Sequence, residues 1–238
     1  MKCRTIRAWR SCSAVAMTSD PIVERLRRLD ACAVSDALDK IGLPGCVTGL
    51  RSASPGRRIA GRVHTVKLKA GLPSSDRPPV HLGAAAIDAS GPGDVIVVEQ
   101  STGIDAGCWG GILSRGAQEK GVAGVICEGL ARDVDEAREI GFPVFCRGYT
   151  ARTARNRVHE DATDVPIEVG GFTVEPGFYA ICDSSAAVFV APDHIEAVLD
   201  AAEEIARREA EMTRRLEAGE AASAVLGANY EHMLKRDG

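Results

Sequence analysis

Three short apolar runs alternate with helical segments in the middle of this 238-residue chain. The runs cover residues 95–98, 122–127 and 143–146, and the segments between them, 109–120 and 134–140, have helical periodicity. Continuous apolar runs of this length are typical of strands that are buried on both faces of a sheet. A β-α-β-α-β order requires parallel pairing with right-handed crossovers. The sequence therefore predicts an α/β fold with a parallel β-α-β core.

Shorter elements are expected on both sides of this core. Asp20-Pro21 is typical of a helix start, and a second short helix is expected over 35–41, followed by a loop over 43–58. A strand over 62–68 and a helix over 80–90 lead into the core. Beyond it, a compact β layer is predicted from four short strands and a long amphipathic helix from its apolar stripe; their ranges are 167–169, 172–174, 179–182, 187–190 and, for the helix, 192–216.

One domain is expected over residues 20–219, with a C-terminal tail over 220–238. Residues 1–19 are interpreted as an N-terminal extension that is disordered or lies upstream of a true start at Met17. The first sixteen residues carry four basic side chains and no acid, so a targeting signal is the alternative. No apolar stretch of signal-peptide length follows them.

Composition narrows the class of protein. Lys and Arg number 29 against 33 Asp and Glu, so the net charge of -4 lacks the basic footprint of a nucleic-acid binder. No apolar run reaches the roughly 18 residues that a membrane-spanning helix needs. The eight cysteines form no C-x-x-C pair, which argues against a zinc site or a disulfide framework and favours the reducing cytoplasm.

Polar residues follow two of the predicted core strands, where ligands of open α/β sheets bind. Residues 99–111 form a polar loop that leads into a helix, and the amides of Gly110, Gly111, Ile112 and Leu113 are candidates for binding a carboxylate. The alternative is that these glycines only form a tight turn.

The second strand end has the sequence Glu128-Gly129-Leu130-Ala131-Arg132-Asp133. Asp133 offers a hard oxygen ligand for Mg²⁺ or Mn²⁺, and Arg132 offers a planar guanidinium for a carboxylate or an oxyanion. Alternatively, Asp133 caps the following helix and Arg132 makes a surface ion pair.

Other reactive side chains fit less well. Lys67 and Lys69 share one face of a strand, where a solvated role is more typical than a Schiff base. The five histidines include no pair at metal-ligand spacing, and Cys108 has no readable histidine partner.

Residues 121–133, Gly-Val-Ala-Gly-Val-Ile-Cys-Glu-Gly-Leu-Ala-Arg-Asp, carry the most specific resemblance to a known family. Together with Gly-Asp-Val-Ile-Val-Val at 93–98 and Trp-Gly-Gly-Ile-Leu at 109–113, they resemble the family of 4-hydroxy-4-methyl-2-oxoglutarate aldolase and the regulator of ribonuclease activity A. The resemblance covers about residues 20–219 and implies an RraA-like, swivelling α/β/β/α type of fold. It also implies a homotrimer or homohexamer with the active site at the subunit interface.

The resemblance assigns roles to the two strand ends. It makes Asp133 the ligand of a divalent metal and Arg132 the residue that holds the substrate and stabilises a pyruvate enolate. Amides around Ile112 and Leu113 bind the substrate carboxylate. No glycine-rich nucleotide loop is present, so no nucleotide cofactor is expected.

Three positions depart from the family pattern. Gly111 stands where many members have an acid after Trp-Gly, Glu128 stands where they favour Asp, and Ala187 replaces a glycine. Glu128 is a hypothesis for the missing catalytic acid. Alignment of the last helix suggests Glu209 as the acid that a neighbouring subunit supplies.

The expected function is a divalent-metal-dependent C–C lyase for a small 2-oxo acid, either an aldolase or an oxaloacetate decarboxylase. One alternative is a non-catalytic regulator that binds ribonuclease E. Another is a divergent enzyme for a different oxo or hydroxy acid.

Overall fold

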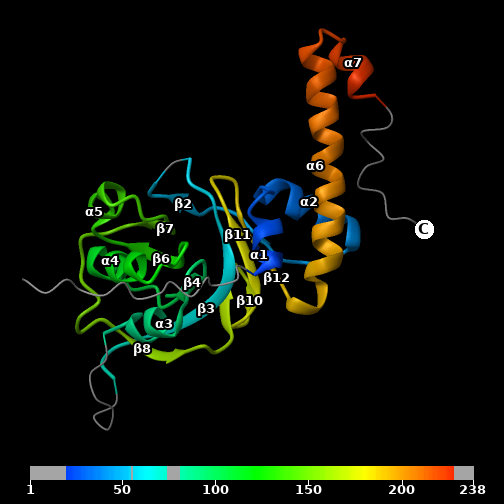
Figure 1. Cartoon of the computed structure of the whole chain (residues 1–238). Helices are drawn as coiled ribbons and strands as arrows, with labels where there is room; N and C mark the ends of the chain where they lie inside the picture. Colours follow the sequence, from blue (N-terminus) through cyan, green and yellow to red (C-terminus); the bar gives the residue numbers. More distant parts are fainter. Residues whose placement is uncertain (1–19, 55, 74–80, 228–238) are drawn as a thin grey trace, which may run out of the picture.

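The computed structural model describes residues 20–54, 56–73 and 81–227. The expectations for residues 1–19 and for the last part of the tail lie outside these residues. A ten-stranded mixed sheet runs through the molecule in the order β1-β12-β11-β3-β4-β6-β7-β2, with β5 paired to β6 and β8 paired to β3 (Figure 1). β9 and β10 form a separate two-stranded sheet.

The predicted parallel core is confirmed. Its four neighbouring strands all run parallel and are β3 (Ile59–Ala70), β4 (Val95–Glu99), β6 (Gly124–Ala131) and β7 (Val144–Tyr149). The helices that join them are α3 (Ala84–Ala89), α4 (Gly111–Glu119) and α5 (Val134–Glu139). Val95 to Val98 are at most 1% exposed, as expected for a strand covered on both faces.

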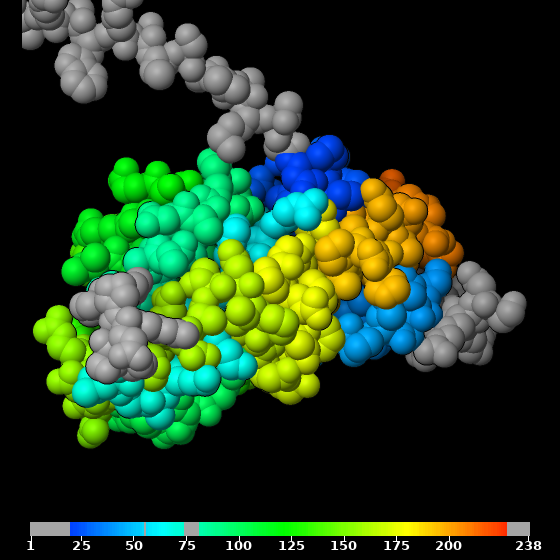
Figure 2. Space-filling view, turned by 90° about the horizontal axis from the view of Figure 1, so that it is seen from below, coloured from blue at the N-terminus to red at the C-terminus, as the bar shows by residue number. Residues whose placement is uncertain are grey.

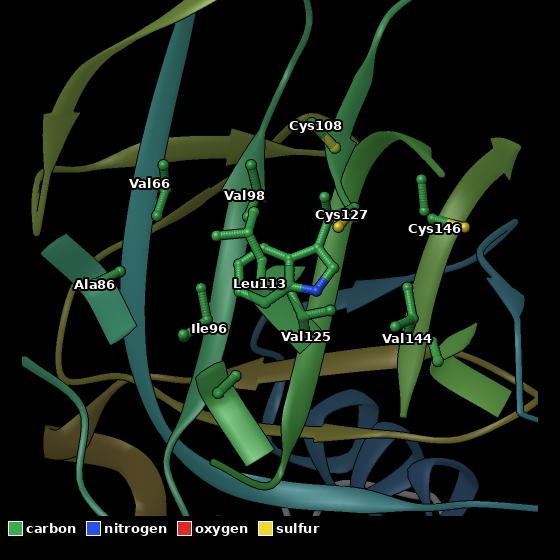
Figure 3. Packing of buried hydrophobic residues seen from close by; sticks show 14 of the residues in the cluster. Val66, Ala86, Ile96, Val98, Cys108, Leu113, Val125, Cys127, Val144 and Cys146 are labelled. Carbon is green, nitrogen blue, oxygen red and sulfur yellow. The ribbon is translucent and has the colours of Figure 1, made fainter. Parts of the chain in front are cut away.

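Alternate residues of these strands enter two different cores. Val98, Cys127 and Cys146, which are register partners on β4, β6 and β7, lie on the face covered by α3, α4 and α5 (Figure 3). Val97 and Ile126 lie on the other face and pack against the hairpin of β9 (Ile167–Val169) and β10 (Phe172–Val174). The core strands are therefore held between helices and a hairpin.

β3 divides the sheet into two wings: the parallel wing with β4, β6 and β7, and a second wing with β11, β12 and β1. Its first residues pair antiparallel with β11 (Tyr179–Cys182), which continues to β12 (Ala187–Val190) and β1 (Cys46–Val47). The four short strands expected as one layer are thus divided: β9 and β10 form the hairpin, whereas β11 and β12 belong to the main sheet. Three helices cover this wing, α1 (Pro21–Leu26), α2 (Ala31–Ile41) and α6 (Ile195–Glu217), with the 3₁₀ turn η1 (Pro192–His194) before α6.

Several elements differ from the sequence-based expectation. The expected loop over 43–58 contains the short strands β1 and β2 (Arg51–Ser52). Two further strands, β5 (Gly107–Trp109) and β8 (Val158–Thr163), were not predicted because they contain no continuous apolar run. β6 continues four residues beyond its predicted end at Cys127, because it pairs with both β5 and β7 across a register shift. A short helix, α7 (Ala222–Val225), lies in the expected tail and buries Val225.

The two wings lie at opposite ends of the molecule. In the view from below, the green segment with α4 and α5 is on one side and α6, in orange, is on the other (Figure 2). Among the described residues, no helix is long and apolar enough to cross a membrane.

Candidate active site

A cavity of about 610 Å³ opens at the carboxyl ends of β3, β5 and β6. One wall holds the start of α4 and the pair Arg132 and Asp133, which follow β6 directly. The rest of the lining includes residues 71–73 after β3 and residues 153–156 and 158–160 around the start of β8. The structure thus brings together six of the sequence-predicted residues on one cavity, namely Gly110, Gly111, Ile112, Leu113, Arg132 and Asp133.

Asp133 is oriented toward the start of α4. Its Oδ2 accepts a hydrogen bond of 3.2 Å from the Gly111 amide, and the Arg132 Nε lies 3.3 Å from its carboxylate. Asp133 occupies the position before α5, yet its side chain makes no capping bond to that helix. Its φ of 53° is in the left-handed region, which Asp tolerates better than most residues. The alternative in which Asp133 only caps α5 is therefore not what the structure shows.

Two close-packed glycines make room for the Arg132 side chain. A Cβ at Gly107 would lie 2.9 Å from the Arg132 Cγ, and a Cβ at Gly110 would lie 3.1 Å from the same atom. The Arg132 amide also donates to the Trp109 carbonyl at 2.9 Å, which fixes the backbone. Gly107 and Gly110 therefore leave the space that the Arg132 side chain occupies, in addition to allowing a turn.

The first turn of α4 has no side-chain cap. Gly110 precedes the helix, and the first intrahelical bond runs from Ser114 to Gly110. The amides of Ile112 and Leu113 therefore have no intrahelical acceptor. Trp109 holds this turn in place, because its Nε1 donates to the buried Ser114 hydroxyl at 3.0 Å. Arg132 adds a cation beside these amides, so the wall favours a carboxylate.

The oxygen ligands of the wall fit a hard divalent cation. Asp133 is a carboxylate that lines an open cavity; its Oδ2 accepts from the Gly111 amide and its Oδ1 accepts from the Arg132 Nε at 3.3 Å. Within the described residues, no three His, Cys, Asp or Glu side chains form a closed metal cluster. Mg²⁺ is commonly held by one or two carboxylates, with water and substrate as the other ligands, so one carboxylate in a water-accessible cavity suits it.

Glu128 lies away from this pair. Its carboxylate accepts from Arg147 at 2.7, 2.9 and 3.0 Å and from the Gly170 amide at 3.0 Å, and it does not line the cavity. The sequence placed Glu128 in a loop after the strand, but it is inside β6. The structure gives it a contact that ties β6 to β7 and to the β9–β10 hairpin.

Another acid occupies the space above Gly111. A Cβ at this position would lie 2.0 Å from the Glu136 Oε2, while the Glu136 Oε1 accepts from the Arg115 Nε at 2.5 Å. The Glu136 carboxylate, from α5, therefore occupies the space that a side chain at position 111 would need. Sequence spacing did not single out Glu136.

Glu209 lies on α6, in the other wing. Partial burial raises its pKa, and the nearby Asp30 and Asp36 raise it further. These acids place Glu209 beside α2, and Figure 1 shows α2 and α6 on the side of the molecule away from α4 and α5. Its expected role toward a neighbouring subunit stays a prediction.

The competing nucleophiles have other surroundings. Lys67 and Lys69 are paired with Glu99 and Asp161 at 3.6 and 2.9 Å, as expected for a polar strand face. Cys108 is fully buried next to Cys127, whose pKa burial raises well above its ordinary value. Neither pattern is that of an activated nucleophile.

The part of the cavity lining that precedes and begins β8 was not identified from the sequence. Its polar residues include Arg155, Asn156, His159 and Glu160, and His81 lies on the same cavity. They belong to segments without clear periodicity and come to the site through the pairing of β8 with β3. The basic run at 152–157 was the available signal.

The part of the chain that contains these cavity residues resembles known proteins. A family model described as RraA-like, Aldolase/RraA, matches residues 31–189, which is more than half of the chain. A 4-hydroxy-4-methyl-2-oxoglutarate aldolase of Thermus thermophilus is 31% identical over 126 residues, covering 53% of this chain and 71% of that protein. Protein DlpA of Legionella pneumophila is 28% identical over 184 residues, covering 77% of this chain but only 29% of DlpA.

A similar fold is found among solved structures of this family. Streptomyces coelicolor RraAS2, described as an unusual member of the RNase ES inhibitor RraA protein family, superposes with a TM-score of 0.72 at 27% identity. The match covers 83% of this chain and 97% of RraAS2. By its sequence match and its fold, this chain belongs to the aldolase/RraA family.

Proposed function

We propose that the protein is a divalent-metal-dependent C–C lyase for small 2-oxo acids, an aldolase of the 4-hydroxy-4-methyl-2-oxoglutarate type, an oxaloacetate decarboxylase, or both. The observation that carries the proposal is one cavity wall with three complementary elements. These are the uncapped first turn of α4, the Arg132 guanidinium and the Asp133 carboxylate. The aldolase name of the Thermus relative supports the same class of reaction.

Each element has a role in cleaving a bond beside a 2-oxo acid. The Ile112 and Leu113 amides bind the substrate carboxylate, which places the 2-oxo group near Arg132. Arg132 stabilises the negative charge that develops as the C–C bond breaks, because its guanidinium is fixed by Asp133 and the glycines before reaction. Asp133 would hold Mg²⁺ or Mn²⁺, which supplies Lewis-acid stabilisation of the enolate. No nucleotide cofactor takes part in this scheme.

The cavity rim favours an assembly of several subunits. Ile112 is 80% exposed and Leu72 is 67% exposed, and both line the cavity. A neighbouring copy in a homotrimer or homohexamer would cover these apolar side chains and bring Glu209 to the site as a further acid. In this proposal the enzyme works in the cytoplasm on a small oxo acid, without nucleic-acid or membrane partners.

The test is pyruvate release from oxaloacetate and from 4-hydroxy-4-methyl-2-oxoglutarate, with Mg²⁺, with Mn²⁺ and with EDTA. We expect release only with a metal ion, and a loss of about 100-fold or more in Asp133→Asn. Asp135→Asn is the matched control, because Asp135 is 87% exposed on α5 and pairs only with Arg138 among the described residues. Release that EDTA or Asp133→Asn leaves unchanged contradicts the proposal.

A second candidate function comes from RraAS2, which is described as a member of an RNase ES inhibitor family. It would make this chain a non-catalytic regulator of ribonuclease E. Absence of release from both compounds, together with binding to ribonuclease E in a pull-down, would favour this role. Absence of both activities would favour a divergent oxo or hydroxy acid as the substrate.

A further inference from the structure

The same cavity is lined by a second cation, Arg155. This part of the wall is a turn over residues 153–156, from which Arg155 and Asn156 both line the cavity. Arg132 is paired with Asp133, whereas no described residue forms an ion pair or side-chain hydrogen bond with the Arg155 guanidinium. Arg155 therefore offers a planar set of donors to whatever enters the cavity.

The turn is fixed at both ends. Arg152 is paired with Asp105 at 3.1 Å, and its carbonyl accepts from the Gly107 amide at 2.9 Å. On the other side, the Arg157 carbonyl accepts from the Gly71 amide at 2.7 Å. Asn156 has a φ of 63°, which is typical of a tight turn. The backbone position of Arg155 is thus set by the fold before any ligand binds.

Neighbouring groups support binding of an anion at this wall. The Nδ1 of His159 lies 3.0 Å from the Gly71 carbonyl, which can only accept, so this nitrogen donates and ties β8 to the end of β3 beside the turn. Asn156 adds an amide with two donors. The acid on the wall, Glu160, already accepts from the Gly83 amide and the Thr163 hydroxyl at 2.6 Å each. Its charge is therefore partly compensated by its own hydrogen bonds.

We propose that Arg155, with Asn156, forms a second anion subsite that recognises a carboxylate at the far end of the substrate. This inference rests on the proposed function, because it takes the Arg132 wall as the place of the 2-oxo acid group. A cavity of about 610 Å³ leaves space beyond a three-carbon acid for such an extension. Arg155 is then a specificity-determining residue that selects dicarboxylic over monocarboxylic 2-oxo acids.

The test compares two ligands that differ at one end only. 2-Oxoglutarate and 2-oxopentanoate have the same chain length, but only the first has a distal carboxylate, and neither has the 4-hydroxyl needed for aldol cleavage. Calorimetry with Mg²⁺ on the full chain is expected to show 2-oxoglutarate binding at least about tenfold more tightly. Arg155→Gln is expected to remove this preference and leave the affinity for 2-oxopentanoate within about twofold.

Two further variants separate the proposals. Arg207→Gln removes another exposed arginine, on α6, for which the described residues provide no ion pair, and it is expected to change neither affinity. Arg132→Ala is expected to weaken both ligands equally. A preference for 2-oxoglutarate that survives in Arg155→Gln overturns the second subsite, while binding of both acids that depends on Arg132 still supports the proposed function. Failure of the wild-type protein to bind either acid overturns both proposals.

Discussion

The two wings of the sheet are built for different tasks. In the parallel wing, short helices of six to nine residues join strands whose carboxyl ends open into the cavity. In the other wing, the 23-residue α6 packs on α1 and α2 and buries Val198, Leu199 and Ala202 completely. Arg25 of α1 adds ion pairs to Glu196, Asp200 and Glu203 of this helix at 2.6–2.8 Å.

This difference shows where the chain can vary without loss of chemistry. The cavity wall depends on glycines that approach Arg132 closely, so small backbone changes there reach the reacting groups. Within the described part of one chain, the α6 wing lines no part of this cavity. Apart from the proposed role of Glu209 toward a neighbouring copy, its residues contribute buried packing against the sheet. Substitutions in the two wings are therefore expected to separate activity from stability.

The largest effect on activity is expected from Arg132→Ala. Removing a fixed cation beside a developing enolate costs about 100- to 1000-fold in kcat/KM. The free energy of unfolding should change by about 1 kcal/mol or less, because the ion pair of Arg132 with Asp133 is partly exposed to solvent. Steady-state kinetics and urea unfolding of the same preparation check both statements, and a variant with normal turnover would remove Arg132 from the mechanism.

In the other wing, Leu199→Ala is expected to show the opposite pattern. Leu199 is 0% exposed in the core between α6 and the sheet, so its truncation should cost about 2–5 kcal/mol of unfolding free energy. Turnover per folded molecule should stay unchanged. Leu216→Ala, at a 38% exposed position on the same helix, is the matched control with little effect.

The parallel core and its strand ends were predictable from sequence because they depend on local patterns. Apolar runs fix β4, β6 and β7, and the position of Arg132 and Asp133 follows from the end of one such run. The Arg155 wall was not predictable in this way. It reaches the site through long-range pairing between β3 and β8, and β8 has a half-exposed sequence without alternation.

The surroundings of Glu128 also could not be predicted from local sequence patterns. Sequence places it four residues before Arg132, close enough along the chain to suggest a shared site. Which face of β6 it lies on depends on pairing that no local pattern reveals, and its partner Arg147 belongs to β7. Likewise, the contact of Glu136 with Gly111 depends on how α5 packs on α4.

Glu128→Gln therefore tests whether this acid is structural. The bidentate contact with Arg147 would be weakened, and we expect a loss of about 1–3 kcal/mol in stability. Activity at a temperature where the variant is folded should remain within about threefold of wild type. Unfolding curves and kinetics measure these effects. A stable but inactive variant would support the hypothesis that Glu128 is the catalytic acid.

An effect on activity smaller than that of Arg132→Ala, but larger than that of Glu128→Gln, is expected from Gly107→Ala. The added methyl would lie 2.9 Å from the Arg132 Cγ, so the arginine stem must move by a few tenths of an ångström. We expect kcat/KM to fall about tenfold, because displacement of a positioned group weakens transition-state contacts. Gly103→Ala is a control for loss of glycine in the same loop, since its Cβ would meet nothing within 4 Å, although its φ of 73° adds some backbone strain.

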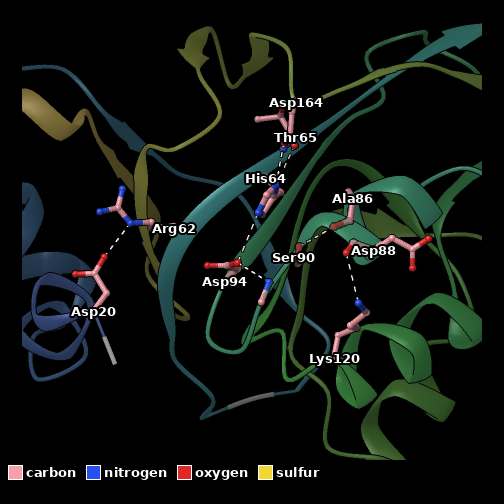
Figure 4. A network of polar contacts seen from close by, with 11 residues as sticks. Asp20, Arg62, His64, Thr65, Ala86, Asp88, Ser90, Asp94, Lys120 and Asp164 are labelled. Carbon is pink, nitrogen blue, oxygen red and sulfur yellow. Dashed lines mark hydrogen bonds and ion pairs between the residues drawn. The ribbon is translucent and has the colours of Figure 1, made fainter. Parts of the chain in front are cut away.

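The smallest effect is expected at His64, which lies on β3 where the two wings meet (Figure 4). Its ring lies 3.6 Å from Asp94 and 3.0 Å from Asp164, and these carboxylates, Asp94 most strongly, raise its pKa above the ordinary value of 6.5. A group whose pKa is raised by folding stabilises the folded state fully below its unfolded pKa. We therefore expect stability to fall, by less than about 1 kcal/mol, as pH rises from about 6.5 through the raised pKa. Urea unfolding at several pH values should show this decline in wild type and a flatter profile in His64→Gln. Equal slopes in the two proteins would mean that the contacts of His64 with Asp94 and Asp164 do not contribute to the junction between the wings.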